Sequence, residues 1–306
     1  MFANRLIQKI LLFIFNISAI TVCEDYENRT YSGARVDITE APFSVIITPV
    51  GCSGALIHPE RVLTAAHCFL TLKTGIYAGF GASDKDKCTY FIKGANIYFH
   101  PNFFKYYYQY ETVLISSCDL AVIILIQPAV LSKQVQVLKL EETKWPNIEN
   151  RKCKVAGYGH NIFDDKALRE ADVIVKHGTN SCGCMSNEGI ICAKSFDSKT
   201  SHKVLNSPCH GDSGSVLVCN DKGVAVTSQA LPISYCGILR RTQLFAAEDS
   251  VCGKPGVIFL FSYIHPHLDW IKSIPSRANI LIYKTIPCSQ LLVLMLSIFS
   301  IYVLLM

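Results

Sequence analysis

The segment SPCHGDSGSVLVC, from Ser207 to Cys219, constrains the fold more than any other part of the 306-residue chain. It places an aspartate, a serine and two glycines between cysteines, and the apolar run Val216-Leu217-Val218 follows at once. In a packed core this cluster would leave polar groups without partners, and a loose linker would not lead directly into an apolar strand. The segment therefore indicates that some chemistry uses the serine, Ser213.

The N-terminal residues 1–23 have the pattern of a secretory signal peptide, because Arg5 and Lys9 precede a short apolar stretch and then small or apolar residues. Cleavage is expected after Ala19 or Cys23. Secretion leads to an oxidising compartment, so most of the fourteen cysteines are expected to form disulfides. The chain is 50% hydrophobic and 17% charged with a net charge of +5, which excludes a disordered chain and predicts no nucleic-acid partner.

The C-terminal residues 275–306 form a hydrophobic tail. From Leu291 to Met306 it is apolar apart from two serines, and as a helix it would span about 24 Å, less than the roughly 30 Å of a hydrocarbon core. The small residues Ser276, Ala278 and Asn279 and a spacer precede this stretch. The pattern favours a lipid-anchor (GPI) signal that is removed, with a retained membrane helix or a tail buried in the fold as alternatives.

Three short motifs carry the residues of one chemistry, in the order His, Asp, Ser. LTAAHC contains His67, CDLAVII places Asp119 at the start of a buried strand, and GDSG contains Ser213. Smaller matches such as CKVAGYG and HLDWI fall in the same order along the chain. Together these motifs resemble those of the chymotrypsin and trypsin-like serine protease family, and the resemblance covers about residues 30–274.

The resemblance implies an all-β fold of two antiparallel six-stranded β-barrels with a C-terminal helix. The first barrel is expected at about residues 30–140 and the second at about 141–274, with the active site at their junction. It also implies a short propeptide, residues 24–29.

Each residue type in the motifs meets a requirement of acyl transfer. A serine hydroxyl is a weak nucleophile at neutral pH, so Ser213 needs a base that accepts its proton and later returns it to the leaving group. His67 is the candidate base, and Asp119 would hold the second ring nitrogen and fix its tautomer. The backbone N–H groups of Gly211 and Ser213 are expected to bind the oxyanion. The alternatives are a buried structural histidine and an aspartate that caps a strand.

The resemblance also implies activation by cleavage after Arg29, so an activating protease is an expected partner. The new ammonium of Thr30 would then bind Asp212 and fix the turn before Ser213. The sequence departs from the family here, because Thr30 stands where the family usually has isoleucine and its hydroxyl suits an alkyl pocket poorly. Asn28-Arg29-Thr30 is also a glycosylation sequon beside the scissile bond.

The expected specificity pocket has Ser207 at its base, with Ala230, Gly256 and Ile258 nearby. Because the base is a serine and not an aspartate, the pattern does not support a preference for Lys or Arg and favours an apolar or aromatic substrate side chain. An aromatic segment, residues 101–118, overhangs the cleft by resemblance. It either contacts substrate or packs on the barrel or on a partner.

The resemblance also implies disulfides. It pairs Cys52 with Cys68, Cys153 with Cys219, Cys192 with Cys182 or Cys184, and Cys209 with Cys236 or Cys252. Cys88 and Cys118 stay unassigned. A zinc site at the Cys182-x-Cys184 pair with Cys192 is the alternative, but closed zinc sites usually need four ligands, so no metal or other cofactor is expected.

The leading hypothesis is a secreted or membrane-anchored serine endopeptidase that acts on protein or peptide substrates. The alternative is a binding or regulatory module that keeps the three residues but stays zymogen-like because Thr30 docks poorly. An α/β-hydrolase esterase is set aside, because its Gly-x-Ser-x-Gly motif would need glycine at Ser215 and its acid and histidine would follow the serine.

Overall fold

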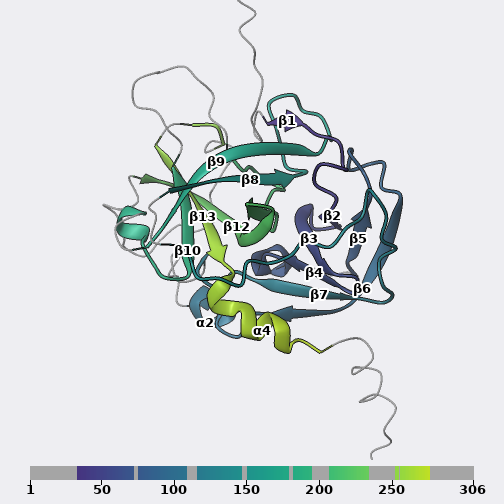
Figure 1. Ribbon diagram of the computed structural model, residues 1–306, viewed down its shortest axis with the longest axis horizontal. Helices are drawn as coiled ribbons and strands as arrows, with labels where there is room; N and C mark the ends of the chain where they lie inside the picture. The colour runs from purple at the N-terminus through teal and green to yellow at the C-terminus, as the bar shows by residue number, and fades with distance from the viewer. Residues whose placement is uncertain are drawn as a thin grey trace, which may run out of the picture.

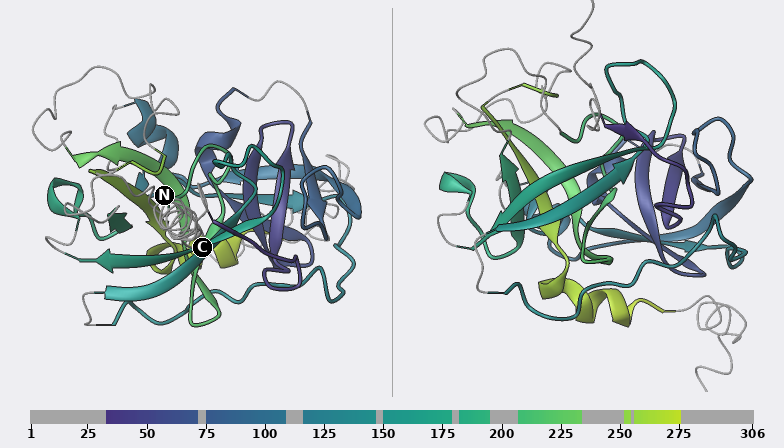
Figure 2. Two further views of the ribbon diagram at one scale, coloured as in Figure 1. Left: turned by 90° about the horizontal axis from the view of Figure 1, so that it is seen from above. Right: turned by 45° about the horizontal axis from the view of Figure 1, so that its top comes forward.

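The computed structural model describes residues 33–71, 75–108, 116–146, 150–178, 182–194, 207–233, 252–254 and 256–275. Within these ranges the chain forms two closed six-stranded antiparallel β-barrels side by side, followed by a short C-terminal helix (Figure 1, Figure 2). This confirms the predicted fold class. The predicted signal peptide 1–23, the propeptide 24–29 and residues 276–306 of the tail lie outside the described residues.

The first barrel brings the His67 and Asp119 segments to one edge. Its strands are β2 (Ser44–Thr48), β3 (Cys52–His58), β4 (Arg61–Thr64), β5 (Tyr77–Phe80), β6 (Tyr90–Phe99) and β7 (Ala121–Leu125). They close in the order β2-β3-β4-β7-β6-β5. The last residue of β4, Thr64, pairs with the first residue of β7, Ala121. His67 follows β4 and Asp119 precedes β7, so strand pairing places them close together.

The second barrel carries the Ser213 segment between two of its strands. Its strands are β8 (Asn150–Gly157), β9 (Arg169–His177), β10 (Ile190–Lys194), β11 (Val216–Cys219), β12 (Lys222–Pro232) and β13 (Val257–Tyr263), with the 3-10 helix η2 (Gly183–Met185) before β10. The order β9-β10-β13-β12-β11-β8 closes where β8 pairs with β9. The short β1 (Ala34–Arg35) also pairs with β9, so the beginning of the described chain joins the second barrel and not the first.

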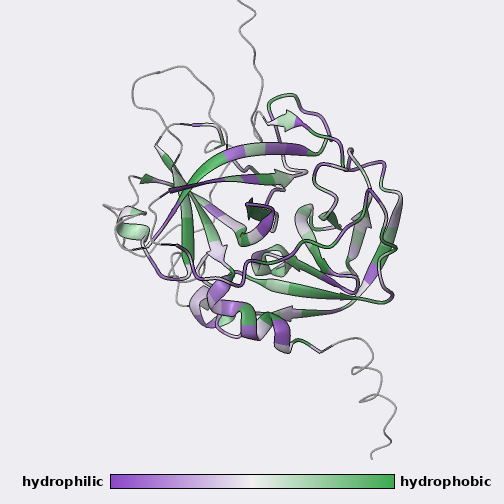
Figure 3. Cartoon of the chain, viewed as in Figure 1, coloured by the Kyte–Doolittle hydropathy of each residue, from purple (hydrophilic) through white to green (hydrophobic). Residues whose placement is uncertain are grey.

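Burial along the strands follows their surroundings. In β8, Asn150, Lys152 and Lys154 are exposed, and Arg151 and Cys153 between them are buried. This period of two is that of a strand with one face in solvent. Strand β7 is buried at every position, and Figure 3 shows its run of apolar residues in the interior.

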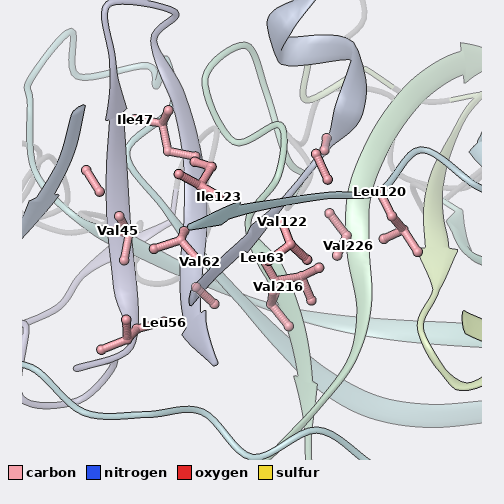
Figure 4. Packing of buried hydrophobic residues seen from close by; sticks show 14 of the residues in the cluster. Val45, Ile47, Leu56, Val62, Leu63, Leu120, Val122, Ile123, Val216 and Val226 are labelled. Atoms are coloured by element: carbon pink, nitrogen blue, oxygen red, sulfur yellow. The ribbon is translucent and has the colours of Figure 1, made fainter. Parts of the chain in front are cut away.

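The two barrels share one hydrophobic core at their junction. Leu63 and Val122 of the first barrel belong to the same buried cluster as Val216 and Val226 of the second (Figure 4). Each such side chain contributes about 1.5–3 kcal/mol when fully buried. The strands that lead into the three motifs therefore meet at a packed and rigid interface.

Helix α4 (Leu268–Ser273) follows the 3-10 helix η4 (His265–His267) and returns to the first barrel. Its buried Leu268 and Ile271 belong to the shared core. Among the described residues, no helix combines the length and the apolar character needed to cross a membrane.

Four disulfides join described cysteines. They are Cys52–Cys68, Cys153–Cys219, Cys182–Cys192 and Cys209–Cys252. Cys192 therefore pairs with Cys182 and Cys209 with Cys252, while Cys184 is disulfide-bonded as well. The bonded sulfurs leave no thiolates for the alternative zinc site, whereas Cys88 and Cys118 are thiols. Cys236 lies outside the described residues.

Candidate active site

His67 lies in a short 3-10 helix, η1 (Ala66–Phe69), directly after β4. The disulfide from the neighbouring Cys68 to Cys52 ties this helix to β3. About a quarter of the His67 side chain is exposed, so the ring has one buried side and one accessible side.

Asp119 lies behind the His67 ring and is fully buried. Its Oδ2 is 2.6 Å from His67 Nδ1, and its Oδ1 accepts a hydrogen bond of 2.9 Å from the His67 backbone N–H. Ser228 on β12 donates its hydroxyl to Asp119 Oδ2 at 2.7 Å. Three donors therefore fix the carboxylate, and the carboxylate fixes the ring.

The two partners shift each other's pKa values. Burial by itself would lower the pKa of His67, but the charge and hydrogen bond of Asp119 outweigh it and raise that pKa above its ordinary 6.5. Burial would raise the pKa of Asp119, but His67 and the hydrogen bond from Ser228 hold it below 3.8. The pair thus favours a carboxylate beside a ring that accepts a proton readily.

Ser213 lies in the turn that precedes β11, and the glycines on both sides shape that turn. Gly211 and Gly214 have φ angles of +92° and +86°, a region that favours glycine. A Cβ at Gly214 would also overlap Thr64 and Ser53 of the first barrel. Ser213 and His67 both line one pocket of about 510 Å³. The structure therefore joins His67 to Asp119 directly and places Ser213 on the same cavity as the ring.

For the two amides at the nucleophile candidate, the described residues provide no acceptor. Among the described residues, neither the Gly211 nor the Ser213 backbone N–H donates a hydrogen bond. The turn is closed instead through Asp212 N–H to the Cys209 carbonyl at 3.0 Å and Ser215 N–H to the Asp212 carbonyl at 2.9 Å. Two neighbouring donors without an acceptor in the described part of the chain match what an oxyanion would need.

Asp212 is a second buried carboxylate, beneath the turn. Its two oxygens accept the backbone N–H groups of Gly159 and Cys209, each at 2.9 Å. A Cβ at Gly157 or Gly159 would overlap this carboxylate, so both glycines make room for it. Burial raises the pKa of Asp212 from 3.8 to about 6, despite these hydrogen bonds. Arg29 and Thr30, the predicted activation residues, lie outside the described residues.

The pocket differs in part from the predicted specificity pocket. Ala230 lines it, whereas Ser207 is buried away from its described lining and accepts the Gly253 N–H at 2.9 Å. Gly256 is exposed, and Ile258 belongs to a separate buried cluster. Phe259 lines the pocket, whereas Ser207, Gly256 and Ile258 are absent from its described lining, so their place in a specificity pocket stays a prediction.

Phe259, the neighbour of the predicted Ile258 on β13, is one of the lining residues. Phe259 of β13 pairs with Ala230 of β12, so the two side chains share one face of the sheet. Leu231 and Phe259 add apolar surface, and the Cys209–Cys252 disulfide forms part of the wall. Among the described lining residues there is no Asp, Glu, Lys or Arg.

Part of the aromatic segment forms helix α2 (Phe103–Tyr108), which packs on the barrel, while its contact with substrate stays a prediction. Phe103 is fully buried and stacks on Phe99 with ring centroids 6.4 Å apart. Tyr107 lines the pocket. One side of the segment therefore packs on the barrel, and another faces the cavity.

Ser228 is a functional candidate that the sequence motifs did not single out. Its contact with Asp119 joins residues 109 positions apart in the chain. Only its place at the substrate-facing edge of the family pattern could have drawn attention to it. Among the described residues, no group of three or more His, Cys, Asp or Glu side chains could hold a metal ion.

Comparison with known proteins shows which family this chain is similar to. The family model described as Trypsin matches residues 30–249. Kallikrein-1E2 of Equus caballus is 26% identical over 269 residues, which cover 80% of this chain and 89% of the relative. Granzyme A of Bos taurus is 31% identical over 231 residues, which cover 72% of this chain and 78% of the relative.

A solved structure shows the same fold. A mutant of human heparin binding protein (CAP37) superimposes with a TM-score of 0.60 at 23% identity, covering 79% of this chain and 95% of the other. At this level of identity the likeness concerns the arrangement of the barrels.

Proposed function

The chain belongs to the trypsin-like serine protease family, and we propose that it is a serine endopeptidase that cleaves protein or peptide substrates through an acyl-enzyme intermediate. One observation carries the proposal. The imidazole of His67, bound to the buried Asp119 at 2.6 Å, lines the same pocket as the hydroxyl of Ser213.

In the proposed reaction, Ser213 Oγ forms a bond to the carbonyl carbon of the scissile peptide, and its proton passes to Nε2 of His67. The carbonyl electron pair moves to the oxygen, which the Gly211 and Ser213 N–H groups bind. Collapse breaks the carbon–nitrogen bond, and His67 returns the proton to the leaving amine. A water molecule then repeats the sequence and releases the acid. Throughout, Asp119 keeps the His67 Nδ1–H in place.

The same proposal includes activation by cleavage between Arg29 and Thr30. The buried Asp212 supports it, because a carboxylate whose pKa is raised to about 6 by burial gains from a cation beside it. The ammonium of Thr30 would supply that charge and hold the turn before Ser213. A glycan on Asn28 would hinder the activating protease.

We propose that the pocket takes an apolar or aromatic substrate side chain. The neutral lining and the apolar walls from Tyr107, Ala230, Leu231 and Phe259 support this preference, since a charged side chain would be buried there without a partner. Peptide substrates that differ only in Phe, Leu, Lys or Glu before the scissile bond would test it. We expect the Phe or Leu peptide to have the highest kcat/KM, and a Lys peptide cleaved fastest would contradict the preference.

We also propose that the enzyme works outside the cell. Its disulfides support this location, because such bonds persist in oxidising compartments. Anchorage to a membrane through residues 275–306 stays a prediction. Release of the protein from cells by a GPI-specific phospholipase would distinguish a lipid anchor from a retained helix.

Active-site labelling tests the enzymatic proposal directly. The secreted protein is first shown by N-terminal sequencing to begin at Thr30 and is then treated with a fluorophosphonate probe. We expect one label per chain on Ser213, none on the Ser213→Ala variant, and cleavage of peptides by the unlabelled protein. A correctly cleaved protein that neither labels nor cleaves would favour the zymogen-like binding module instead.

A further inference from the structure

Ser53, the second residue of β3, contacts both residues of the proposed oxyanion site. Its side-chain hydroxyl donates a hydrogen bond of 2.8 Å to the Gly211 carbonyl, and its backbone N–H donates one of 2.9 Å to the Ser213 carbonyl. These contacts join residues of the first barrel to a turn of the second, 158 positions away for Gly211. Ser53 itself is 1% exposed, and its bond to the Gly211 carbonyl is part-buried.

The Ser53 hydroxyl has a second partner. The backbone N–H of Tyr158 donates to it at 3.3 Å, next to Gly159, whose own N–H binds Asp212. The Ser53 carbonyl in turn accepts the Thr64 hydroxyl at 2.8 Å. One side chain therefore connects the first barrel, the segment around Tyr158 and the turn that carries the nucleophile candidate.

From these contacts we infer that Ser53 is a positioning residue that keeps the Gly211 amide directed at the oxyanion. The inference rests on the proposed function, because it assigns a role in the same reaction. Ser53 is not itself among the described lining residues of the pocket, and it acts through the peptide groups of the turn.

The backbone of Gly211 explains why such a tether matters. A glycine at φ +92° has no Cβ to restrict rotation, so its neighbouring peptide groups turn more easily than those of other residues. The Ser53 hydroxyl holds the Gly211 carbonyl from one side, and the Gly159 backbone lies 3.0 Å from the place of a Gly211 Cβ on the other. Without the hydroxyl, the Gly211 carbonyl would lose a donor. Movement of that peptide group would shift the Gly211 Cα, which joins it to the preceding peptide group that carries the Gly211 N–H.

A positioning role of Ser53 and a merely structural role predict different kinetics for its variants. An oxyanion donor acts on the charge that develops in the transition state, so its loss lowers kcat and leaves KM nearly unchanged. It also weakens inhibitors that form a tetrahedral adduct with Ser213, such as peptide boronates. The alcohol analogue of a peptide aldehyde does not react with Ser213 and only occupies the pocket. Its affinity for the variant should therefore equal that for the wild type.

The experiment compares Ser53→Ala and Ser53→Thr with wild type, all cleaved at Arg29 and counted by active-site titration. We expect Ser53→Ala to lower kcat roughly tenfold or more, against the 10²–10³-fold typical for complete loss of an oxyanion donor. The boronate should weaken by the same factor, with KM and alcohol binding within about twofold of wild type. Ser53→Thr keeps the hydroxyl and should recover most of the rate.

Ser44→Ala is the matched control. Ser44 is also a buried serine of the first barrel, on the strand next to β3, and its hydroxyl has no hydrogen-bond partner within the described residues. Its removal should leave every constant within about twofold. If Ser53→Ala does not fold, Ser53→Gly serves instead, since it leaves space for a water where the hydroxyl was.

Two results would overturn the inference without touching the proposed function. One is an active wild type together with a Ser53→Ala variant whose kcat and boronate affinity stay within twofold of the wild-type values. The other is an equal loss in KM and alcohol binding, which would show distortion of the pocket. A cleaved wild type that does not label at Ser213 would instead remove the proposed function and this inference with it.

Discussion

Two buried aspartates belong to the candidate active site, and they differ in how their charge is compensated. Asp119 and Asp212 are 0% and 1% exposed, and both accept backbone N–H groups. Asp119 also faces the His67 ring, which holds its pKa below 3.8, whereas burial raises the pKa of Asp212 to about 6. Two amide donors and the charge of Lys85 therefore do not offset the burial of Asp212, whereas the neighbouring His67 ring, with the Ser228 hydroxyl, does so for Asp119.

The difference separates the site into two functional halves. The acid–base half, His67 with Asp119, is complete within the first barrel and Ser228. The nucleophile half rests on a turn above Asp212, and no described Lys or Arg forms an ion pair with that carboxylate. This arrangement makes the second half depend on a charge supplied from elsewhere, as the proposed cleavage at Arg29 would do.

The largest effect is expected from a substitution that breaks the pair of His67 and Asp119. Asp119→Asn removes the charge and offers the ring an amide, so the wrong tautomer of His67 is favoured and kcat should fall on the order of 10⁴-fold. The carboxylate is also what raises the pKa of His67, so that pKa should fall. The acid limb of kcat/KM, where activity is lost as pH falls, should therefore move to lower pH.

Initial rates measured from pH 5 to 9, with the enzyme concentration set by active-site titration, would give both the fall in kcat and the shift of the acid limb. The unfolding midpoint of the variant serves as the control for folding. A variant with more than a tenth of the wild-type kcat would contradict the role of Asp119.

The second test concerns the uncompensated carboxylate. Because the pKa of Asp212 is raised, the folded state holds its proton more tightly, and stability is lost as pH rises from 3.8 through about 6. The difference between these values corresponds to about 3 kcal/mol. In an Arg29→Gln protein, which cannot be cleaved there, we expect this loss in the free energy of unfolding between pH 4 and pH 7.

Protein cleaved at Arg29 should lose less stability over the same range, because the Thr30 ammonium favours the charged form of Asp212. Asp212→Asn in the uncleavable protein should flatten the dependence. Urea unfolding of the three proteins at several pH values makes the comparison, and equal slopes in all three would contradict the role given to Asp212.

The smallest effect is expected at Ser228, whose hydroxyl binds Asp119 in the acid–base half of the site. A hydrogen bond to a charged group is worth about 1.5–3 kcal/mol, so Ser228→Ala should lower kcat roughly tenfold, because Asp119 loses one of the donors that orient it. Ser262→Ala is the control, since the Ser262 hydroxyl is bonded to the carbonyls of Ser116 and Asp119 and not to the carboxylate. That variant should be less stable but keep kcat within about threefold. An equal loss of kcat in the Ser228→Ala and Ser262→Ala variants would indicate a general effect on packing and would contradict the role given to Ser228.

Much of this architecture could be predicted from the sequence because the motifs are local. GDSG, LTAAHC and CDLAVII each contain their own turn or strand signal, and their resemblance to the chymotrypsin and trypsin-like serine protease family implied two barrels with His67, Asp119 and Ser213 at the junction. The disulfides Cys52–Cys68 and Cys153–Cys219 followed from the same resemblance.

The pocket was harder to predict, for a physical reason. Strand β13 is buried at every position, so its sequence has no polar alternation that would show which side chains face the cavity. A shift of one residue along such a strand reverses the face of each side chain, and here Phe259, not Ile258, lines the described pocket. The choices between Cys182 and Cys184 and between Cys236 and Cys252 were likewise open.

The sequence by itself determined the reactive groups, their order along the chain and the oxidising setting, because these depend only on residue type and short spacing. The tertiary structure decided which groups meet. His67 reaches Asp119 across 52 positions and Ser53 reaches Gly211 across 158, and both contacts exist because two closed barrels fix strand register and pack against each other. Register and closure are properties of the whole set of strands, so no single segment encodes them.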